Sequence, residues 1–340
     1  MTGKRIHGIA GSPALWKPPR AGLMILLFLA VCRPVYAGTP VGKPGAGNDI
    51  FRFVISRNML SEVKVEDTRA AMKVWIQTVA ATRQIPIDPE PGVYDNLEEM
   101  IRALRDNAVD GFNVTTEECW RLSKAIKPGR VVVGVNNDQI MEEYVILVRR
   151  DKGFKSIDDL RSRSLRMLDN PRMSLAVIWL DSLLLGKGLN PATTFCGPVT
   201  SAGKLSQTVL PVFFGQSDAC LVTRRGFHTM SELNPQVGNQ LDVLAASPGV
   251  VPTVFAFRAD SISPFRDLII AEMERLPETP AGQQILTLIM ADRIEERPMA
   301  CLDSAFDLLT TYHGLISARS RDKAGGGRLL KTETQPGGKK

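Results

Sequence analysis

The sequence predicts an α/β protein built as two lobes on one plan. Its 340 residues are enough for one large or two moderate domains. Apolar, β-branched segments alternate with segments of helical periodicity, which is typical of a largely parallel sheet. Two segments, NAVDGFNVT (107–115) and GQSDACLVT (215–223), share an Asp, a small residue after it and a final Val-Thr. If this similarity is a repeat rather than chance, a cleft lies between two similar lobes.

The expected elements follow from periodicity, beginning at the first apolar segment. Residues 50–56 (IFRFVIS) are apolar and β-branched, as in a buried strand. Residues 65–83 have helical spacing. The apolar residues that we place near this spacing are Ala70, Val74, Ile76 and Val79.

A second helix is expected within 95–107 (DNLEEMIRALRDN), because Asp95 or Asn96 can cap it and acids occupy its first turn. Its apolar stripe is formed by Leu97, Ile101 and Leu104. Further strands are expected at VVVGV (131–135) and YVILVRR (144–150), followed by a short helix that enters a strand at SIDDLRSRSLRML (156–168).

The amino terminus is typical of a secretory signal peptide. A basic, acid-free leader precedes the apolar run AGLMILLFLAVC (21–32), and VYA-G offers small residues for cleavage between Ala37 and Gly38. The run is short for a membrane span, so a cleaved leader is favoured over an uncleaved anchor. We expect a signal peptide over 1–37, a Gly/Pro linker over 38–48 and a disordered tail over 319–340.

The charge distribution argues against a nucleic-acid partner. The formal net charge of +6 arises at the two ends of the chain. Without the five basic residues of 1–37, and the seven basic and two acidic residues of 319–340, residues 38–318 hold 30 basic and 34 acidic residues. The folded body is therefore slightly acidic and lacks a net basic footprint.

No catalytic, metal or cofactor site is expected. A phosphate-binding P-loop has four residues between its glycines and a Ser or Thr after its lysine. Here five residues separate Gly197 from Gly203, and Leu205 follows Lys204, so the stretch does not match. No nucleophile–base set is found, and Asp158 and Asp159 are more simply helix-start residues. The cysteines outside the leader are Cys119, Cys196, Cys220 and Cys301. Their spacing is not that of a zinc site, so we interpret them as small buried residues, with one disulfide as the alternative.

The segment EEYVILVRRDKGFKSIDDLRSRSLRMLDNP (142–171) resembles exported solute-binding proteins of phosphate/phosphite/phosphonate ABC transporters. The resemblance continues through GLNP (188–191), GQSDA (215–219) and SPGVVPTVFAFR (247–258), and covers most of 50–312. It implies a type II periplasmic-binding fold, with two lobes joined by two crossing strands and a ligand held between them. On that plan the first lobe takes 48–142 and 252–318, and the second takes 143–251.

The resemblance also implies a set of ligand-binding residues. The family's two aromatic positions fall on Tyr94 and on Tyr144, and a core residue is the alternative interpretation of Tyr144. The family's Ser-Thr-Ser clamp falls on Arg172, Met173 and Ser174, where Arg172 either supplies a charged fork for an anion or is simply solvated. Asn170, two residues before Arg172, is included in the candidate ligand set.

The family's ligand histidine falls on Leu205, so the imidazole is absent, but a polar helix start remains. The candidate residues there are Lys204, Ser206 and Gln207; for Lys204 a solvated helix cap is the competing interpretation. Where aminophosphonate binders place acids, this chain has Arg225, or its neighbour Arg224, and Thr253. Neither type of residue pairs with an ammonium group, so a simple oxyanion is a better ligand than a zwitterion.

The resulting hypothesis is a monomeric, periplasmic, non-catalytic protein that binds a phosphate- or phosphonate-type oxyanion and delivers it to an ABC permease. The alternatives are a sensory protein on the same fold, partnered with a membrane signalling protein, and an orphan with an altered ligand.

Overall fold

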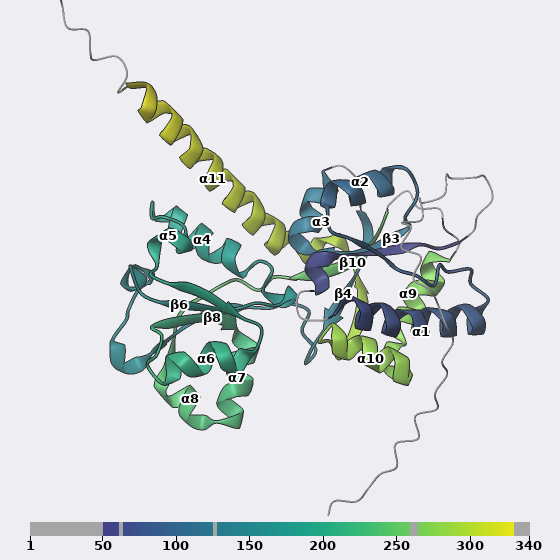
Figure 1. The fold of residues 1–340 in the computed structure, drawn as a ribbon, viewed down its shortest axis with the longest axis horizontal. Coiled ribbons are helices and arrows are strands. Elements are labelled where there is room, and N and C mark those ends of the chain that lie inside the picture. Colours follow the sequence, from purple (N-terminus) through teal and green to yellow (C-terminus); the bar gives the residue numbers. More distant parts are fainter. Residues whose placement is uncertain (1–49, 61–63, 125–127, 259–262, 264, 330–340) are drawn as a thin grey trace, which may run out of the picture. The chain divides into compact units, whose positions relative to one another are not determined.

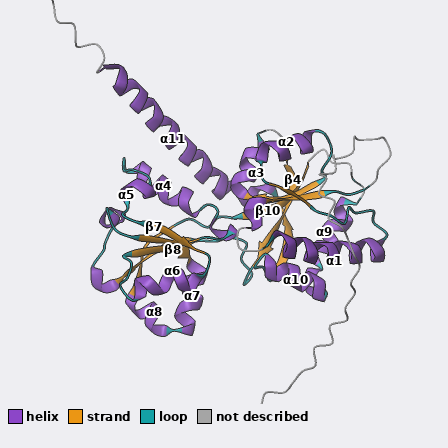
Figure 2. Cartoon of the chain, viewed as in Figure 1, coloured by secondary structure: helices purple, strands orange, loops and turns teal. Residues whose placement is uncertain are grey.

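The structure is a computed structural model that describes residues 50–60, 64–124, 128–258, 263 and 265–329. The expected signal peptide and linker, and residues 330–340 of the expected tail, lie outside the described residues. The described part contains two mixed β-sheets, each flanked by helices (Figures 1 and 2). Among these residues, no helix has both the length and the apolar character needed to cross a membrane.

The first sheet has six strands in the order β11-β4-β10-β3-β1-β2. The strands are β1 (Phe53–Ser56), β2 (Gly92–Tyr94), β3 (Gly111–Thr115), β4 (Pro128–Val135), β10 (Thr253–Arg258) and β11 (Arg293–Arg297). Strand β1 is parallel to β2 and β3, and β10 is antiparallel to both β3 and β4. The surrounding helices are α1 (Val65–Arg83), α2 (Leu97–Arg105), α3 (Thr116–Ser123), α9 (Arg266–Glu274) and α10 (Pro280–Leu288), with short 3₁₀ segments η1 (Arg57–Leu60), η5 (Leu276–Glu278) and η6 (Met299–Leu302). We call this sheet and its helices the first lobe.

The second sheet has five strands in the order β7-β6-β8-β5-β9. The strands are β5 (Tyr144–Arg149), β6 (Leu165–Leu168), β7 (Val199–Ala202), β8 (Ala219–Thr223) and β9 (Leu241–Ala246). The helices of this second lobe are α4 (Ala176–Gly186), α5 (Ala192–Phe195), α6 (Leu205–Phe213), α7 (Arg224–Leu233) and α8 (Pro235–Gln240), with η2 (Arg150–Lys152), η3 (Ile157–Leu160) and η4 (Pro171–Met173). Strand β6 is parallel to β7 and β8, and β5 is antiparallel to β8 and β9. Both sheets therefore contain the same arrangement of three parallel strands followed by an antiparallel strand.

The two similar sequence segments occupy equivalent places in the two sheets. Asp110 precedes β3, and its carboxylate accepts a hydrogen bond of 2.8 Å from the backbone N–H of Arg52, just before β1. Asp218 precedes β8, and its carboxylate accepts one of 3.0 Å from the backbone N–H of Ser164, just before β6. Each Asp thus fixes the start of its own strand beside the neighbouring parallel strand, as the repeat predicts.

The final threonines of the two segments are also equivalent. The Thr115 hydroxyl accepts from the Glu118 N–H at the start of α3, and the Thr223 hydroxyl accepts from the Gly226 N–H at the start of α7. A side-chain cap satisfies one of the N–H groups that a helix start leaves unpaired. The unit found in both segments therefore consists of an Asp that anchors the strand, the strand itself and a Thr that caps the next helix.

The caps and stripes of the first lobe agree only partly with the sequence. Asn96, rather than Asp95, caps α2 by accepting from the Glu98 N–H. The buried face of α1 differs from the expected one, because Ala70 is exposed and Val74 is 54% exposed. The residues of α1 that are buried are Thr68, Ala71, Trp75, Ile76 and Val79. The large Trp75 side chain packs inward on this face, which turns Val74 toward solvent.

The carboxy-terminal helix corrects the expected start of the tail. Helix α11 (Asp303–Leu329) continues past residue 319 and packs against α3 and α4. The Arg319 guanidinium donates to the backbone oxygen of Leu189 (2.9 Å) and to the Asn190 side chain. This contact holds the helix where the sequence alone indicated disorder.

Two segments cross between the sheets, from β4 to β5 and from β9 to β10. They are joined by backbone hydrogen bonds, since Glu142 N–H donates to Val250 O (2.7 Å) and Val250 N–H donates to Glu142 O (2.9 Å). The Ser247 hydroxyl accepts from the Tyr144 N–H at 2.7 Å. These bonds fix Glu142 at the point where the chain passes from one lobe to the other.

The four described cysteines carry free thiols; Cys119, Cys196 and Cys220 are buried, whereas Cys301 is half-buried. Burial raises the pKa of Cys119 to about 12 and that of Cys196 to about 11. Thiols held in this state are protonated at neutral pH and are poor nucleophiles.

Candidate functional site

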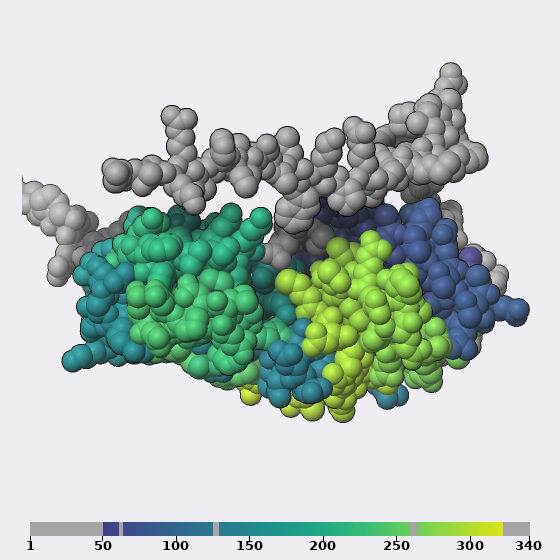
Figure 3. Space-filling model, turned by 90° about the horizontal axis from the view of Figure 1, so that it is seen from below, coloured from purple at the N-terminus to yellow at the C-terminus, as the bar shows by residue number. Residues whose placement is uncertain are grey.

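A cavity of about 560 Å³ is lined by residues of both lobes, and we call it the interlobe pocket. Its wall in the second lobe lies at the carboxyl ends of β6 and β8 and at the starts of α6 and α7, which is where open α/β sheets bind ligands. Its wall in the first lobe comes from the end of β4 and the segment between α10 and β11. Figure 3 shows this face, with the green segment that carries α6 and α7 and the yellow-green segment that carries α10 on either side of a hollow.

The centre of the site is a buried carboxylate shared by two arginines. The Glu142 side chain is 5% exposed, and its Oε1 lies 3.0 Å from Nη2 of Arg172. The same oxygen accepts a hydrogen bond from Nη2 of Arg225. Arg172 and Arg225 line the interlobe pocket, whereas Glu142 lies behind them beside a smaller cavity. The cluster has two positive charges and one negative charge, so its own net charge is +1, and Asp292 adds one carboxylate elsewhere in the pocket wall.

Burial weakens the solvation of both kinds of charge in this cluster. Burial lowers the pKa of the Arg172 guanidinium, and the nearby Glu142 carboxylate partly offsets this shift. Burial raises the pKa of Glu142, and the attraction of the two arginines opposes the shift. The single Glu142 carboxylate cannot neutralise both arginines. An anion placed against Arg172 and Arg225 would supply the second negative charge.

Two asparagines add neutral polar groups to the same pocket. Asn136, at the end of β4, is 8% exposed, and its Nδ2 has no hydrogen-bond partner among the described residues. Asn170 caps η4, with its Oδ1 accepting from the Arg172 N–H at 3.1 Å. A buried amide donor without a partner is unfavourable, so the Asn136 side chain favours an acceptor in the pocket.

Tyr144 and Ser174, both expected to contact the ligand, instead hold the protein backbone. Tyr144 is fully buried, and its hydroxyl donates to the backbone oxygen of Arg172 at 2.9 Å. The Ser174 hydroxyl donates to the backbone oxygen of Pro252 at 2.9 Å. Both hydrogen bonds position η4 and therefore the Arg172 side chain. Tyr144 is thus a core residue, which was the alternative interpretation of this position.

The remaining expected residues lie around the pocket rather than in it. Lys204 is the exposed residue before α6, and its side chain makes no cap, while its neighbours Gly203 and Leu205 line the pocket. Ser206 and Gln207 are exposed. Tyr94 is half-buried at the end of β2 and lines none of the cavities described here, and Thr253 lines two smaller neighbouring cavities. Of the expected set, Asn170, Arg172 and Arg225 come together in the wall of the interlobe pocket.

The sequence did not point to Glu142, Asn136 or Asp292, although all three line this site. Glu142 was within the segment that carried the resemblance, two residues before the strand that begins at Tyr144. Glu142 could have been found from the sequence, because it is a carboxylate at an expected crossing between the lobes in a chain with two candidate ligand-binding arginines. Asn136 had only its place after the strand VVVGV to mark it.

The two lobes, the two crossing segments and the charged pocket between them define a type II periplasmic-binding protein. The family model described as "ABC transporter, phosphonate, periplasmic substrate-binding protein" matches residues 59–297. The chain therefore belongs to this family of transporter components, as the resemblance implied. Members of this family bind substrates for transporters in the periplasm rather than catalyse reactions.

Solved structures have the same fold at low sequence identity. XAC2383 from Xanthomonas citri, solved with bound chloride, is 13% identical, with a TM-score of 0.57, over 80% of this chain and 100% of that one. PA3383 from Pseudomonas aeruginosa, a binding protein component of an ABC phosphonate transporter, is 12% identical, with a TM-score of 0.53, over 84% of this chain and 95% of that one. A comparison with curated protein sequences gives no match.

Proposed function

We propose that this protein binds a phosphonate-type oxyanion in the interlobe pocket and delivers it to an ABC permease. In this proposal the anion contacts Arg172 and Arg225, and the amides of Asn136 and Asn170 complete its hydrogen bonds. Tyr144 and Ser174 act as positioning residues beneath η4. The protein works as a non-catalytic monomer with no nucleic-acid partner.

The observation that carries the proposal is the surplus positive charge of the Arg172–Glu142–Arg225 cluster. Each guanidinium has five N–H donors in a planar fork, and Glu142 offers a single oxygen to the pair. The remaining donors match the oxygen-rich, tetrahedral geometry of a phosphonate. Binding between the lobes is also the arrangement in which closure buries the anion.

A ligand panel tests this function on the protein purified from the periplasm of an expressing bacterium. The panel contains methylphosphonate, phosphite, phosphate, sulfate and aminoethylphosphonate, measured by thermal shift and then by calorimetry. A ligand at about a hundred times its dissociation constant adds roughly 2.7 kcal/mol to stability, which is a shift of several degrees. Methylphosphonate is expected to give such a shift, and a flat panel would reject a phosphonate-type ligand.

The panel also discriminates between simple and zwitterionic ligands. Glu142 is committed to the two arginines, and Asp292 is the carboxylate that lines the interlobe pocket within the described part of the chain. One Asp292 oxygen already accepts from the Asn137 N–H at 2.8 Å. Weaker binding of aminoethylphosphonate than of methylphosphonate is expected, and the reverse order would assign the ammonium group to Asp292.

Export is expected to remove the leader after Ala37. The apolar run at 21–32 and the small residues around Ala37 support this position. Intact mass and amino-terminal sequencing of the periplasmic protein should give Gly38 as the first residue. A mass that retains residues 1–37 would show an uncleaved anchor instead.

A further inference from the structure

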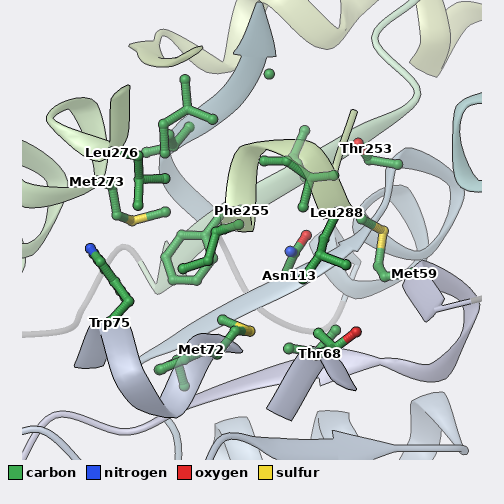
Figure 4. Close-up of a pocket in the computed structure, with 18 of the residues that line it drawn as sticks. Met59, Thr68, Met72, Trp75, Asn113, Thr253, Phe255, Met273, Leu276 and Leu288 are labelled. Carbon is green, nitrogen blue, oxygen red and sulfur yellow. The ribbon is translucent and has the colours of Figure 1, made fainter. Parts of the chain in front are cut away.

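A second cavity, of about 120 Å³, lies within the first lobe between the sheet and helices α1 and α10. Figure 4 shows it surrounded by aliphatic, aromatic and thioether side chains, among them Met72, Trp75, Phe255, Met273 and Leu276. Protein interiors are normally packed as densely as organic crystals, so an apolar space of this size inside a lobe is unusual. An engineered apolar cavity of about 150 Å³ stays dry and binds benzene, which sets the scale of the group that fits here.

A smaller cavity of about 50 Å³, which we call the neck, shares lining residues with both the apolar cavity and the interlobe pocket. Met59, Thr253 and Leu288 line both the apolar cavity and the neck. Asn136 and Arg172 line both the neck and the interlobe pocket. The neck therefore adjoins the charged cluster on one side and the apolar cavity on the other, with Thr253 in its wall.

We propose that the natural ligand is an amphipathic oxyanion, whose charged head binds Arg172 and whose apolar substituent occupies the cavity of the first lobe. This inference rests on the proposed function and deepens it, because it names the class of substituent. The head needs the donors of the cluster, whereas the cavity offers few polar groups to a bound group, chiefly those of Thr68 and Asn113. A short alkyl chain or a phenyl ring fits that chemistry, and a second charged group does not.

The inference predicts a dependence of affinity on chain length. The probes are methyl-, ethyl-, propyl-, butyl- and phenylphosphonate, titrated by calorimetry into the periplasmic protein. Each methylene group that enters the cavity should tighten binding by about fourfold, because burying a methylene is worth about 0.8 kcal/mol. The gain should stop when the cavity is full.

Two variants test whether the gain arises in the cavity. Leu288→Trp narrows the neck, and Met72→Phe fills the cavity from α1; both side chains are half-buried, and they lie on different walls. Met167→Phe is the matched control, since Met167 is half-buried in the second lobe and lines none of the three cavities. Methylphosphonate should bind all four proteins alike, whereas the gain for butylphosphonate should disappear in Leu288→Trp and Met72→Phe alone.

The outcomes separate this inference from the proposed function. Methylphosphonate binding with no gain along the series, or a gain that both variants retain, would overturn the inference and leave the function intact. If no member of the series binds, the function fails and the inference fails with it. If one variant does not fold, the other variant still decides between these results.

Discussion

Replacing Arg172 with Met is expected to weaken methylphosphonate binding by roughly thirtyfold to several thousandfold. Removing one partner of a close, desolvated charge pair costs about 2–5 kcal/mol of binding free energy. Arg172 faces the interlobe pocket from η4 and is 19% exposed, so water can replace its charge only poorly. Glu142 keeps Arg225 as its partner in this variant, so the fold should survive. Calorimetric titration of the variant and the wild-type protein measures the difference.

Arg224→Met is the matched control for this substitution. Arg224 is adjacent to Arg225 in the sequence, but its side chain is 45% exposed and pairs with Glu143. Its removal should leave methylphosphonate affinity unchanged. Arg172→Lys keeps the charge without the planar fork and should recover part of the affinity. Equal losses in Arg172→Met and Arg224→Met would show that net charge alone, and not this cluster, attracts the anion.

Replacing Glu142 with Gln is expected to lower the melting temperature by roughly 5 °C. The substitution leaves two guanidinium groups, 19% and 27% exposed, without their carboxylate. Breaking a buried ion pair from one side costs about 3–5 kcal/mol, and the partial exposure of the arginines favours the lower figure. About 3 kcal/mol corresponds to this change in melting temperature for a chain of this size.

The control for Glu142→Gln is the same substitution one residue later. Glu143 pairs with Arg224 at the surface, where an ion pair contributes about 0–1 kcal/mol. Glu143→Gln should therefore leave the melting temperature almost unchanged. Sulfate should stabilise Glu142→Gln more than the wild-type protein, because an anion replaces the missing carboxylate. A variant as stable as the wild-type protein would show that Glu142 does not neutralise the arginines.

Glu142 connects the ligand site with the crossing between the lobes. Its backbone pairs with Val250 in the other crossing segment, and its side chain holds Arg172 and Arg225 of the second lobe. Hinge closure in two-lobed proteins is absorbed by a few residues at such crossings. In the proposed function, an anion that competes with Glu142 for the arginines would therefore act on a residue of the crossing between the lobes.

Much of the fold could be predicted from local sequence patterns. The alternation of apolar and helical segments, the cap at Asn96 and the paired Asp–Thr segments are properties of a few neighbouring residues. Such features are visible in a sequence because hydrogen bonds within a turn or a strand start depend on short spacings. The face of α1 was predicted only in part. Ile76 and Val79 are buried, but Val74 is exposed in place of Trp75, because only the packed neighbours decide which of the two enters the core.

The sequence by itself determined the α/β class, the two similar lobes and the resemblance to phosphonate-binding proteins, together with Arg172 and Arg225 as candidates. Only the tertiary structure decided that these two arginines share Glu142, and that Tyr144 and Ser174 support η4. It also decided that the apolar cavity shares lining residues with the neck, which Arg172 lines as well. The partners in each case come from separate elements, and the energy of a buried charge or an empty cavity depends on what surrounds it in space. No local spacing in the chain encodes that environment.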